Sequence, residues 1–121
     1  GEKRQAHASP ACPYDAIVGL YHEAFPEHPR VAIVNAKRKG AMKARWTEAG
    51  ERLRMLNRDT SVAERLDYFR RLFARASRSD FLTGKKAFRD GTVYRVDFDK
   101  LMSPSGFMGV IEGKYDNREV A

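Results

Sequence analysis

The sequence predicts a mainly α-helical single domain with one minor β-hairpin. Three observations carry this prediction. The chain has 121 residues and 42% apolar content, which suits one ordinary hydrophobic core. Apolar residues recur at helical spacing in three separate stretches. Turn residues flanked by β-branched and aromatic side chains predict the hairpin near residues 85–96.

The N-terminal part is expected to contain a linker followed by a first helix. Residues 1–13 scatter prolines and small residues without an apolar period, so we expect a linker or a cloning remnant there. The folded domain is then expected over residues 14–118. Its first helix is expected over residues 14–25, where Pro13 suits the first turn and Pro26 ends the helix.

A second helix is expected over residues 36–49. Asn35 is the expected N-cap, and Gly50 is expected to stop the helix. Residues 51–57 are expected to add no more than a short turn of their own.

The remaining elements are expected from their capping residues. Ser61 and Glu64 form a capping box that opens a third helix. After the hairpin, Asp97 is expected to cap a short helix and Ser105 a last one, which Gly113 closes. The expected core is apolar and drawn from all the elements: Ile17, Tyr21, Phe25, Trp46, Phe69, Leu72, Phe73, Phe81, Leu82, Phe98, Leu101, Phe107 and Ile111.

The basic charge of the chain is concentrated in one segment. The chain carries 23 Lys and Arg against 16 Asp and Glu, a formal net charge of +7, and residues 30–58 hold nine basic and two acidic residues. The whole excess therefore lies in this segment. A localised basic segment favours an anionic partner, most often nucleic acid. A solvated basic helix face is the alternative interpretation.

Aromatic residues near this segment extend the nucleic-acid hypothesis. Trp46, flanked by Lys43 and Arg45, either stacks on bases or packs in the core with Met42. Tyr68 is a second, weaker stacking candidate. A conventional helix-turn-helix is not favoured, because the connection after the second helix is too long. The expected nucleic-acid contacts are basic residues of the segment and of the third helix: Arg30, Lys37, Arg38, Lys39, Lys43, Arg45, Arg52, Arg54, Arg70, Arg71 and Arg75.

The sequence predicts no enzyme, no metal site and no cofactor. The lone Cys12 lies between prolines without a base beside it and fits a reducing compartment. His22 and His28 lack the spacing of a zinc motif and are interpreted as surface or capping residues. Asp97 and Asp99 diverge on a helix, and no glycine pattern matches a phosphate loop. No apolar run is long enough to span a bilayer, so we expect no membrane partner.

The C-terminal half resembles a known family. The segments SDFLTG at residues 79–84, YRVDFDKLM at 94–102 and FMGVIEGKYDN at 107–117 follow, in order, a pattern found in the C-terminal region of many phage and prophage DNA-replication proteins. The chain departs from that pattern at Lys100, where the family usually has Trp, and at Gly109, where Lys is usual.

The resemblance implies a role in phage DNA replication, as an initiator or replisome organiser in the cytoplasm of the bacterial host. It implies DNA binding, recruitment of the host replicative helicase, or both, and leaves self-association open. We therefore expect a non-enzymatic replication accessory domain that binds single-stranded or duplex DNA through its basic surface. The alternative is a protein-interaction module that recruits or loads the helicase. The EGKYDN segment alone is also interpreted as a helix stop in which Gly113 reverses the chain.

Overall fold

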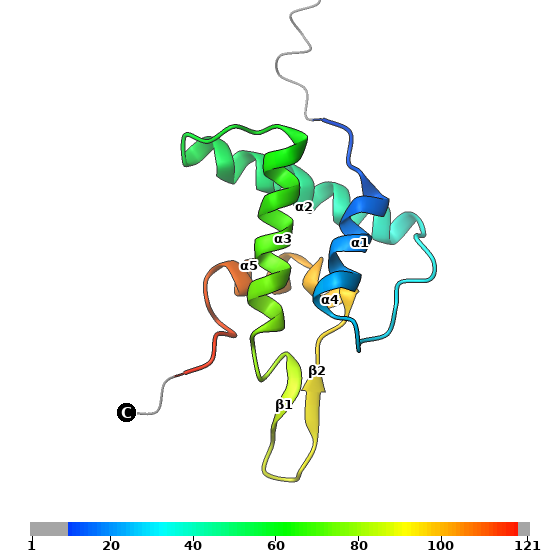
Figure 1. The fold of residues 1–121 in the computed structure, drawn as a ribbon, viewed down its shortest axis with the longest axis vertical. Helices are drawn as coiled ribbons and strands as arrows, with labels where there is room; N and C mark the ends of the chain where they lie inside the picture. The colour runs from blue at the N-terminus through cyan, green and yellow to red at the C-terminus, as the bar shows by residue number, and fades with distance from the viewer. Residues whose placement is uncertain (1–9, 119–121) are drawn as a thin grey trace, which may run out of the picture.

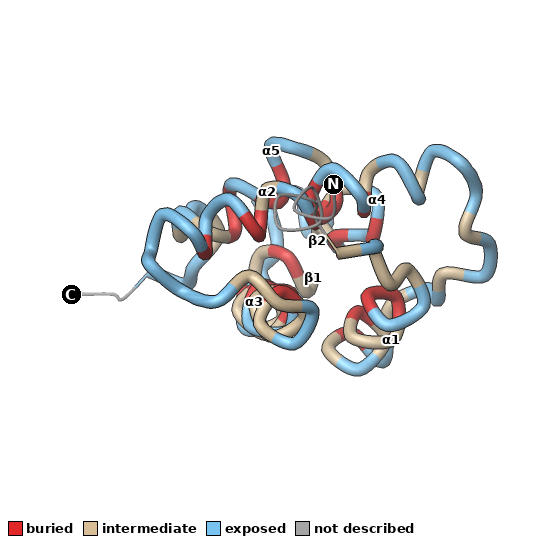
Figure 2. The backbone as a smooth tube through the Cα atoms, turned by 90° about the horizontal axis from the view of Figure 1, so that it is seen from above, coloured by how far each residue is buried: buried red, intermediate tan, exposed pale blue. Residues whose placement is uncertain are grey.

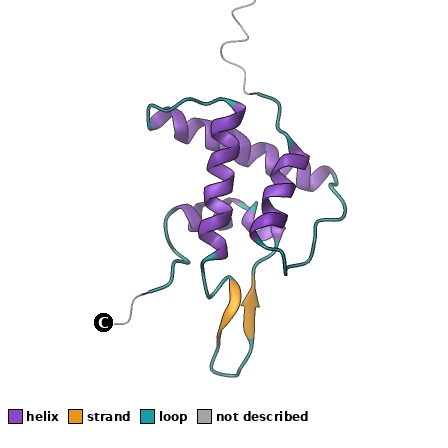
Figure 3. Cartoon of the chain, viewed as in Figure 1, coloured by secondary structure: helices purple, strands orange, loops and turns teal. Residues whose placement is uncertain are grey.

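The computed structural model describes residues 10–118 of the chain. Five helices and a two-stranded hairpin follow one another within this range (Figure 1, Figure 3). The elements are α1 (Tyr14–Ala24), α2 (Ala36–Met55), α3 (Val62–Ser77), β1 (Thr83–Ala87), β2 (Val93–Arg95), α4 (Phe98–Leu101) and α5 (Pro104–Ile111). The predicted fold class, a mainly helical single domain with a minor hairpin, is confirmed.

Helices α1 and α3 lie side by side, and α2 crosses behind them at one end (Figure 1). The short helix α5 lies behind the other half of α3, α4 lies behind the end of α1, and the buried stretches face this shared interior (Figure 2). Tyr21 of α1 packs edge-on against Phe73 of α3 and Phe98 of α4, with ring centroids 5.9 and 5.3 Å apart. Phe69 of α3 contacts Trp46 of α2 at 6.0 Å. One aromatic core therefore joins four of the helices.

The predicted core is confirmed except at its edge, where Phe81 and Ile111 are only half-buried. Trp46 is 1% exposed, and its indole N–H donates to the carbonyl of Pro10 at 2.8 Å. The core interpretation of Trp46 is therefore correct, and the stacking alternative is wrong.

The linker predicted over residues 1–13 extends too far along the chain. Pro10 is held by the Trp46 hydrogen bond, and Cys12 packs against the core. Residues 10–13 therefore belong to the folded domain. The rest of this prediction, residues 1–9, lies outside the described residues.

Helix α2 continues through Gly50 to Met55, so the predicted stop at Gly50 is wrong. The guanidinium of Arg65, on α3, lies against Gly50, and a Cβ at this glycine would overlap it. Arg65 is 2% exposed and donates to the carbonyls of Thr60 and Trp46, at 2.7 and 3.0 Å. Glycine at this position makes room for a neighbouring helix and does not end its own.

The predicted caps at the starts of α2, α3 and α4 are confirmed, but the glutamate half of the capping box is wrong, because the N–H of Ser61 donates to Asp59 and the Glu64 carboxylate pairs with Arg58. The side chains of Asn35, Ser61 and Asp97 each accept a hydrogen bond from a backbone N–H three residues on. The last helix is different, because Ser103 caps it and not Ser105. The proline after Ser103 stands at the first helical position, where its missing N–H costs nothing.

The hairpin projects from the end of α3 (Figure 1, Figure 3). Strands β1 and β2 pair in antiparallel orientation, and Gly91 takes a φ of +87° at the turn. Glycine adopts this left-handed conformation without the steric cost that a side chain would bring. The prediction of a hairpin near residues 85–96 is confirmed.

The loop between α1 and α2 is held by the two histidines. The N–H of Val31 donates to Nε2 of His22 at 2.9 Å, and Nδ1 of His28 donates to the carbonyl of Val96 at 2.9 Å. Both imidazoles thus have backbone partners. The two residues anchor the loop, which is a structural role close to the capping role that the sequence indicates.

Candidate nucleic-acid interface

The basic segment over residues 30–58 does not form one surface. Arg38, in the first turns of α2, makes a two-pronged ion pair with Asp99 of α4, with Nε–Oδ1 and Nη2–Oδ2 distances of 2.9 and 3.2 Å. Its third donor is bonded to the carbonyl of Ile33 at 2.9 Å. The Asp99 hydrogen bonds raise the pKa of the Arg38 guanidinium further above its usual range. The Arg38 charge therefore serves to attach α4 to α2.

Arg45 has an internal role as well. It is 6% exposed, and Nη1 donates to the carbonyl of Met102 at the end of α4, at 3.1 Å. Nη2 is paired with Glu48 at 2.7 Å. A phosphate cannot reach a buried guanidinium without opening the contact between α2 and α4. The prediction that Arg45 contacts nucleic acid is therefore wrong.

Three exposed lysines lie toward the N-terminal end of α2, and we call them the lysine end: Lys37, Lys39 and Lys43. The ammonium of Lys39 lies 5.8 Å from the ring centroid of Tyr14, on α1. Arg30 is also exposed, in the loop before α2. These predicted contact residues are accessible to solvent, and Lys39 is the only basic residue of the described range that lines the neighbouring cavity of about 580 Å³, beside Tyr14 and Asp15.

A second basic surface forms where the end of α2 meets α3 and α5. It is a groove of about 580 Å³ with an apolar floor that includes Leu53, Leu72 and Val110. We call it the arginine groove after the basic side chains that line it: Arg52, Arg58, Arg71, Arg75 and Arg78. Asp116 is its only acidic lining residue within the described range. Two arginines from the predicted segment thus meet two from α3 and the arginine that caps its C-terminal end.

The groove arginines differ in how far their charges are neutralised. Arg75 is paired with Asp116 through two hydrogen bonds of 3.0 and 2.7 Å, and it also donates to the carbonyl of Ile111. Arg71 is paired with Asp67 at 2.9 Å, and Arg58 with a carboxylate of α3 at 3.2 Å. These exposed pairs are weak and exchange readily for other anions.

Two groove arginines have no ion-pair partner among residues 10–118. Arg52, on the last turns of α2, and Arg78, at the end of α3, are both exposed. Arginine donors in a fixed fork match the geometry of phosphate oxygens. These two side chains are therefore the most available phosphate ligands of the groove.

The C-terminal segment forms one wall of the groove. Helix α5 ends at Ile111, and Gly113 takes a φ of +79°, which turns the chain back toward α3. Asn117 then donates to the carbonyl of Arg78 and accepts from the N–H of Asp80, both at 2.8 Å. The helix-stop interpretation of EGKYDN is thus supported, and its last residues dock the segment onto α3.

Besides the residues described above, two further predicted contact residues lie outside the groove. Arg70 does not line it and is ion-paired with Asp67 on its own helix. Arg54 is exposed near the end of α2 and is also absent from the lining. Tyr68 does line the groove, half-buried, with its ring 6.3 Å from that of Phe107.

The sequence analysis missed two groove residues, Arg58 and Arg78. Arg58 was part of the basic segment but fell after the expected end of the second helix. Arg78 follows the third helix, where its direction depends on the tertiary contact with the C-terminal segment. The helical spacing of Arg71, Arg75 and Arg78 on one flank of α3 is the signal that could have found the groove.

Other site chemistry is limited in the described part of the chain. Burial raises the pKa of the Cys12 thiol to about 11, so little thiolate is present at neutral pH. No group of three or more His, Cys, Asp or Glu side chains among residues 10–118 is arranged to hold a metal ion. No helix in this range is both long and apolar enough to cross a membrane.

Comparison of the chain with protein-family models, with curated protein sequences and with solved structures found no match.

Proposed function

We propose that this domain binds DNA through the arginine groove, as a non-enzymatic accessory domain of phage-type DNA replication. The observation that carries the proposal is the convergence of five arginines from α2, α3 and the connection between them on one groove with a single lining carboxylate. Arginines that contact phosphates release condensed counterions and so supply salt-dependent affinity. The C-terminal sequence resemblance supports the assignment to replication.

The groove suits a phosphate backbone better than the lysine end does. Its five arginines line one concave surface. The hydrogen bonds of Asn117 dock the C-terminal segment beside this surface, onto the end of α3. At the lysine end, Lys37 and Lys43 are exposed on α2, and Lys39 is the only basic residue within 10–118 that lines the cavity beside α1. We therefore expect the groove to carry most of the affinity, with the lysine end adding a smaller electrostatic contribution.

Fluorescence anisotropy with labelled single-stranded and duplex oligonucleotides at several salt concentrations tests the proposal. We expect Arg52→Ala combined with Arg78→Ala to weaken binding and to lower the salt slope by about 2. Lys37→Ala with Lys43→Ala is expected to have a smaller effect. Arg89→Ala, at an exposed arginine of the hairpin turn, is the matched control.

Two results would count against the proposal in different ways. Absence of binding at low salt would refute DNA binding altogether. Binding that falls in the lysine-end variant but stays unchanged in the groove variant would reject the groove as the interface.

A second candidate function is the recruitment or loading of the host replicative helicase. Three apolar side chains near the junction of α2 and α3 favour it: Met55, Leu56 and Val62 are 78%, 52% and 41% exposed. Exposed apolar groups supply affinity between proteins. A pull-down with the helicase that survives the groove substitutions and fails in Met55→Ser with Val62→Ser, two residues outside the groove lining, would favour this function.

A further inference from the structure

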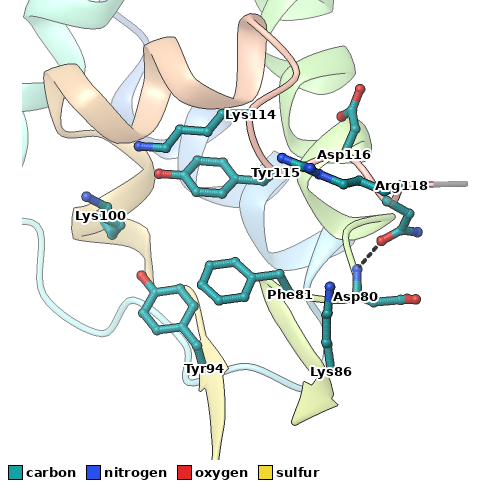
Figure 4. A pocket seen from close by; sticks show the side chains of 10 residues that line it. Asp80, Phe81, Lys86, Tyr94, Lys100, Lys114, Tyr115, Asp116 and Arg118 are labelled. Carbon is teal, nitrogen blue, oxygen red and sulfur yellow. Dashed lines mark hydrogen bonds between the residues drawn. The ribbon is translucent and has the colours of Figure 1, made fainter. Parts of the chain in front are cut away.

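A second cavity lies on the same side of the molecule as the C-terminal segment. It has a volume of about 830 Å³ and is formed by the hairpin, α4 and residues 114–118 (Figure 4). The volume is within the range of about 300–1,000 Å³ that is usual for small-molecule and nucleotide sites. We call it the aromatic pocket.

Three aromatic rings in this pocket lie almost parallel to one another. The centroids of Phe81 and Tyr94 are 5.0 Å apart with an interplanar angle of 15°, and those of Phe81 and Tyr115 are 6.1 Å apart at 8°. All three side chains are only half-buried. In Figure 4 the two tyrosine hydroxyls point to the side on which Lys100 lies. The pocket thus offers a stack of rings that is not fully covered by the protein.

A helix glycine is needed to seat one of these rings. A Cβ at Gly109 of α5 would come within 2.7 Å of Cε2 of Tyr115. The ring therefore lies directly on the backbone of α5. The hydrogen bonds of Asn117 to the end of α3 hold the segment that carries Tyr115. The contact with the backbone of α5 and the hydrogen bonds of Asn117 therefore both restrict the position of Tyr115.

The rim of the pocket is basic. Four cationic side chains line it: Lys86, Lys100, Lys114 and Arg118. None of these four has an ion-pair partner within residues 10–118. The ammonium of Lys114 lies 5.5 Å from the Tyr115 ring centroid, and that of Lys100 donates to a serine hydroxyl at 3.4 Å. The two acidic lining residues are Asp80 and Asp116, and Asp116 is engaged by Arg75.

Flat aromatic rings inside a basic rim fit a ligand that is itself flat, aromatic and anionic. A nucleotide unit within a single strand has this chemistry, because its base stacks on aromatic side chains while its phosphates meet Lys and Arg. A base within a duplex is already stacked and paired, so it cannot occupy such a pocket. The pocket therefore distinguishes an unpaired strand from a duplex.

The aromatic pocket and the arginine groove share a wall. Asp116 lines both of them, and a smaller depression of about 220 Å³ between them is lined by Arg75, Arg78, Ser79, Asp116 and Asn117. A strand whose phosphates follow the groove can therefore place a base in the pocket.

We infer that the aromatic pocket binds an unpaired base of single-stranded DNA, so that the domain prefers single strands to duplexes. This inference rests on the proposed DNA-binding function and adds the strand preference to it.

The test compares three probes: oligothymidylate, an abasic strand of the same length, and a duplex. The abasic strand keeps the phosphates and lacks the bases. We expect the unaltered chain to bind oligothymidylate about tenfold more tightly than the abasic strand.

Tyr94→Leu with Tyr115→Leu should remove most of this difference and leave abasic and duplex binding unchanged. Tyr94→Phe with Tyr115→Phe, which keeps both rings, should keep the difference.

The outcomes separate the two proposals. Equal affinity of the unaltered chain for all three probes would reject base binding in the aromatic pocket but not DNA binding in the arginine groove. Absence of binding to every probe would reject both proposals. Tighter binding of oligouridylate RNA, or equal competition by polyglutamate, would overturn the assignment to DNA. If the double leucine variant does not fold, the NMR signals of Tyr94 and Tyr115 in the unaltered chain decide. They should shift with oligothymidylate and not with the abasic strand, and the opposite result rejects the pocket.

Discussion

A buried arginine with no carboxylate partner among residues 10–118 holds the junction of α2 and α3. Arg65 satisfies its donors with the carbonyls of Thr60 and Trp46, and its guanidinium lies 5.5 Å from the centroid of the Trp46 ring. Burial lowers its pKa below the usual range, and the charge of Arg54 adds to this effect. The plane of the guanidinium rests on Gly50. Gly50 therefore favours the stability of the fold only while the Arg65 side chain lies against it.

This coupling predicts a change of sign in a double-mutant cycle. In the unaltered chain, we expect Gly50→Ala to lower the free energy of unfolding by about 1–3 kcal/mol, because the new methyl group overlaps Arg65. In an Arg65→Ala background, the same change should raise stability by up to about 1 kcal/mol, because alanine favours the helix. Urea denaturation of the four proteins measures the cycle. Additive effects would show that the two residues are independent.

At the scale of elements, the contact between α4 and α5 depends on a glycine in the first turn of α5. A Cβ at Gly106 would overlap the carbonyl oxygen of Lys100, which belongs to α4. We expect Gly106→Ala to destabilise the fold by about 2 kcal/mol, since backbone cannot yield as a side chain can.

Two helix glycines with open surroundings provide the matched controls for this prediction. A Cβ at Gly19 or Gly40 would meet nothing within 4 Å. Gly19→Ala and Gly40→Ala should therefore stabilise the domain by up to about 1 kcal/mol. The urea concentrations at the unfolding midpoints of the three variants test this prediction. A stabilising Gly106→Ala would mean that the two helices are not held at this distance in solution.

The sequence predicts elements well where the determining contacts are local. The caps at Asn35, Ser61 and Asp97 bond to a backbone group three residues on, so their role is legible from sequence. Gly50 was misread as a helix stop because the reason for a glycine there comes from Arg65, on another helix. Ser105 was chosen over Ser103 because the sequence analysis treated the following proline as an interruption and not as the first helical residue.

At the scale of the whole molecule, the net charge of a segment differs from the number of its charged side chains that are free to bind a ligand. Linear spacing located the basic segment correctly, but two of its arginines hold α4 in place, and Arg45 is buried while doing so. The arginine groove joins residues from α2 and α3 that only the packing of α2 against α3 brings together. The aromatic pocket joins the hairpin to the C-terminal segment in the same way. The sequence therefore predicts which basic and aromatic side chains are present, but not which of them share a surface.

The pKa shifts predict how the stability of the whole domain depends on pH. Burial, with the charge of Arg30, lowers the pKa of His22, whose neutral ring accepts the N–H of Val31. Burial raises the pKa of Cys12 from 9.0 to about 11 and, with neighbouring charges, that of Tyr21 from 10.0 to about 12. The unfolded chain therefore binds more protons than the fold just below the ordinary histidine pKa, and fewer above about pH 9.

Stability should consequently fall on both sides of a plateau. The contribution of His22 is complete above its ordinary pKa of about 6.5 and is lost as the pH falls below that value. The contributions of Cys12 and Tyr21 are complete below 9.0 and 10.0 and are lost as the pH rises toward about 11 and 12. Denaturant titrations across this range measure both limbs. Cys12→Ala with Tyr21→Phe should flatten the alkaline limb, since the Tyr21 hydroxyl has no hydrogen-bond partner among the described residues. An alkaline limb of unchanged steepness in that variant would assign the loss to other groups, such as Tyr68 and Tyr94, whose pKa values burial also raises.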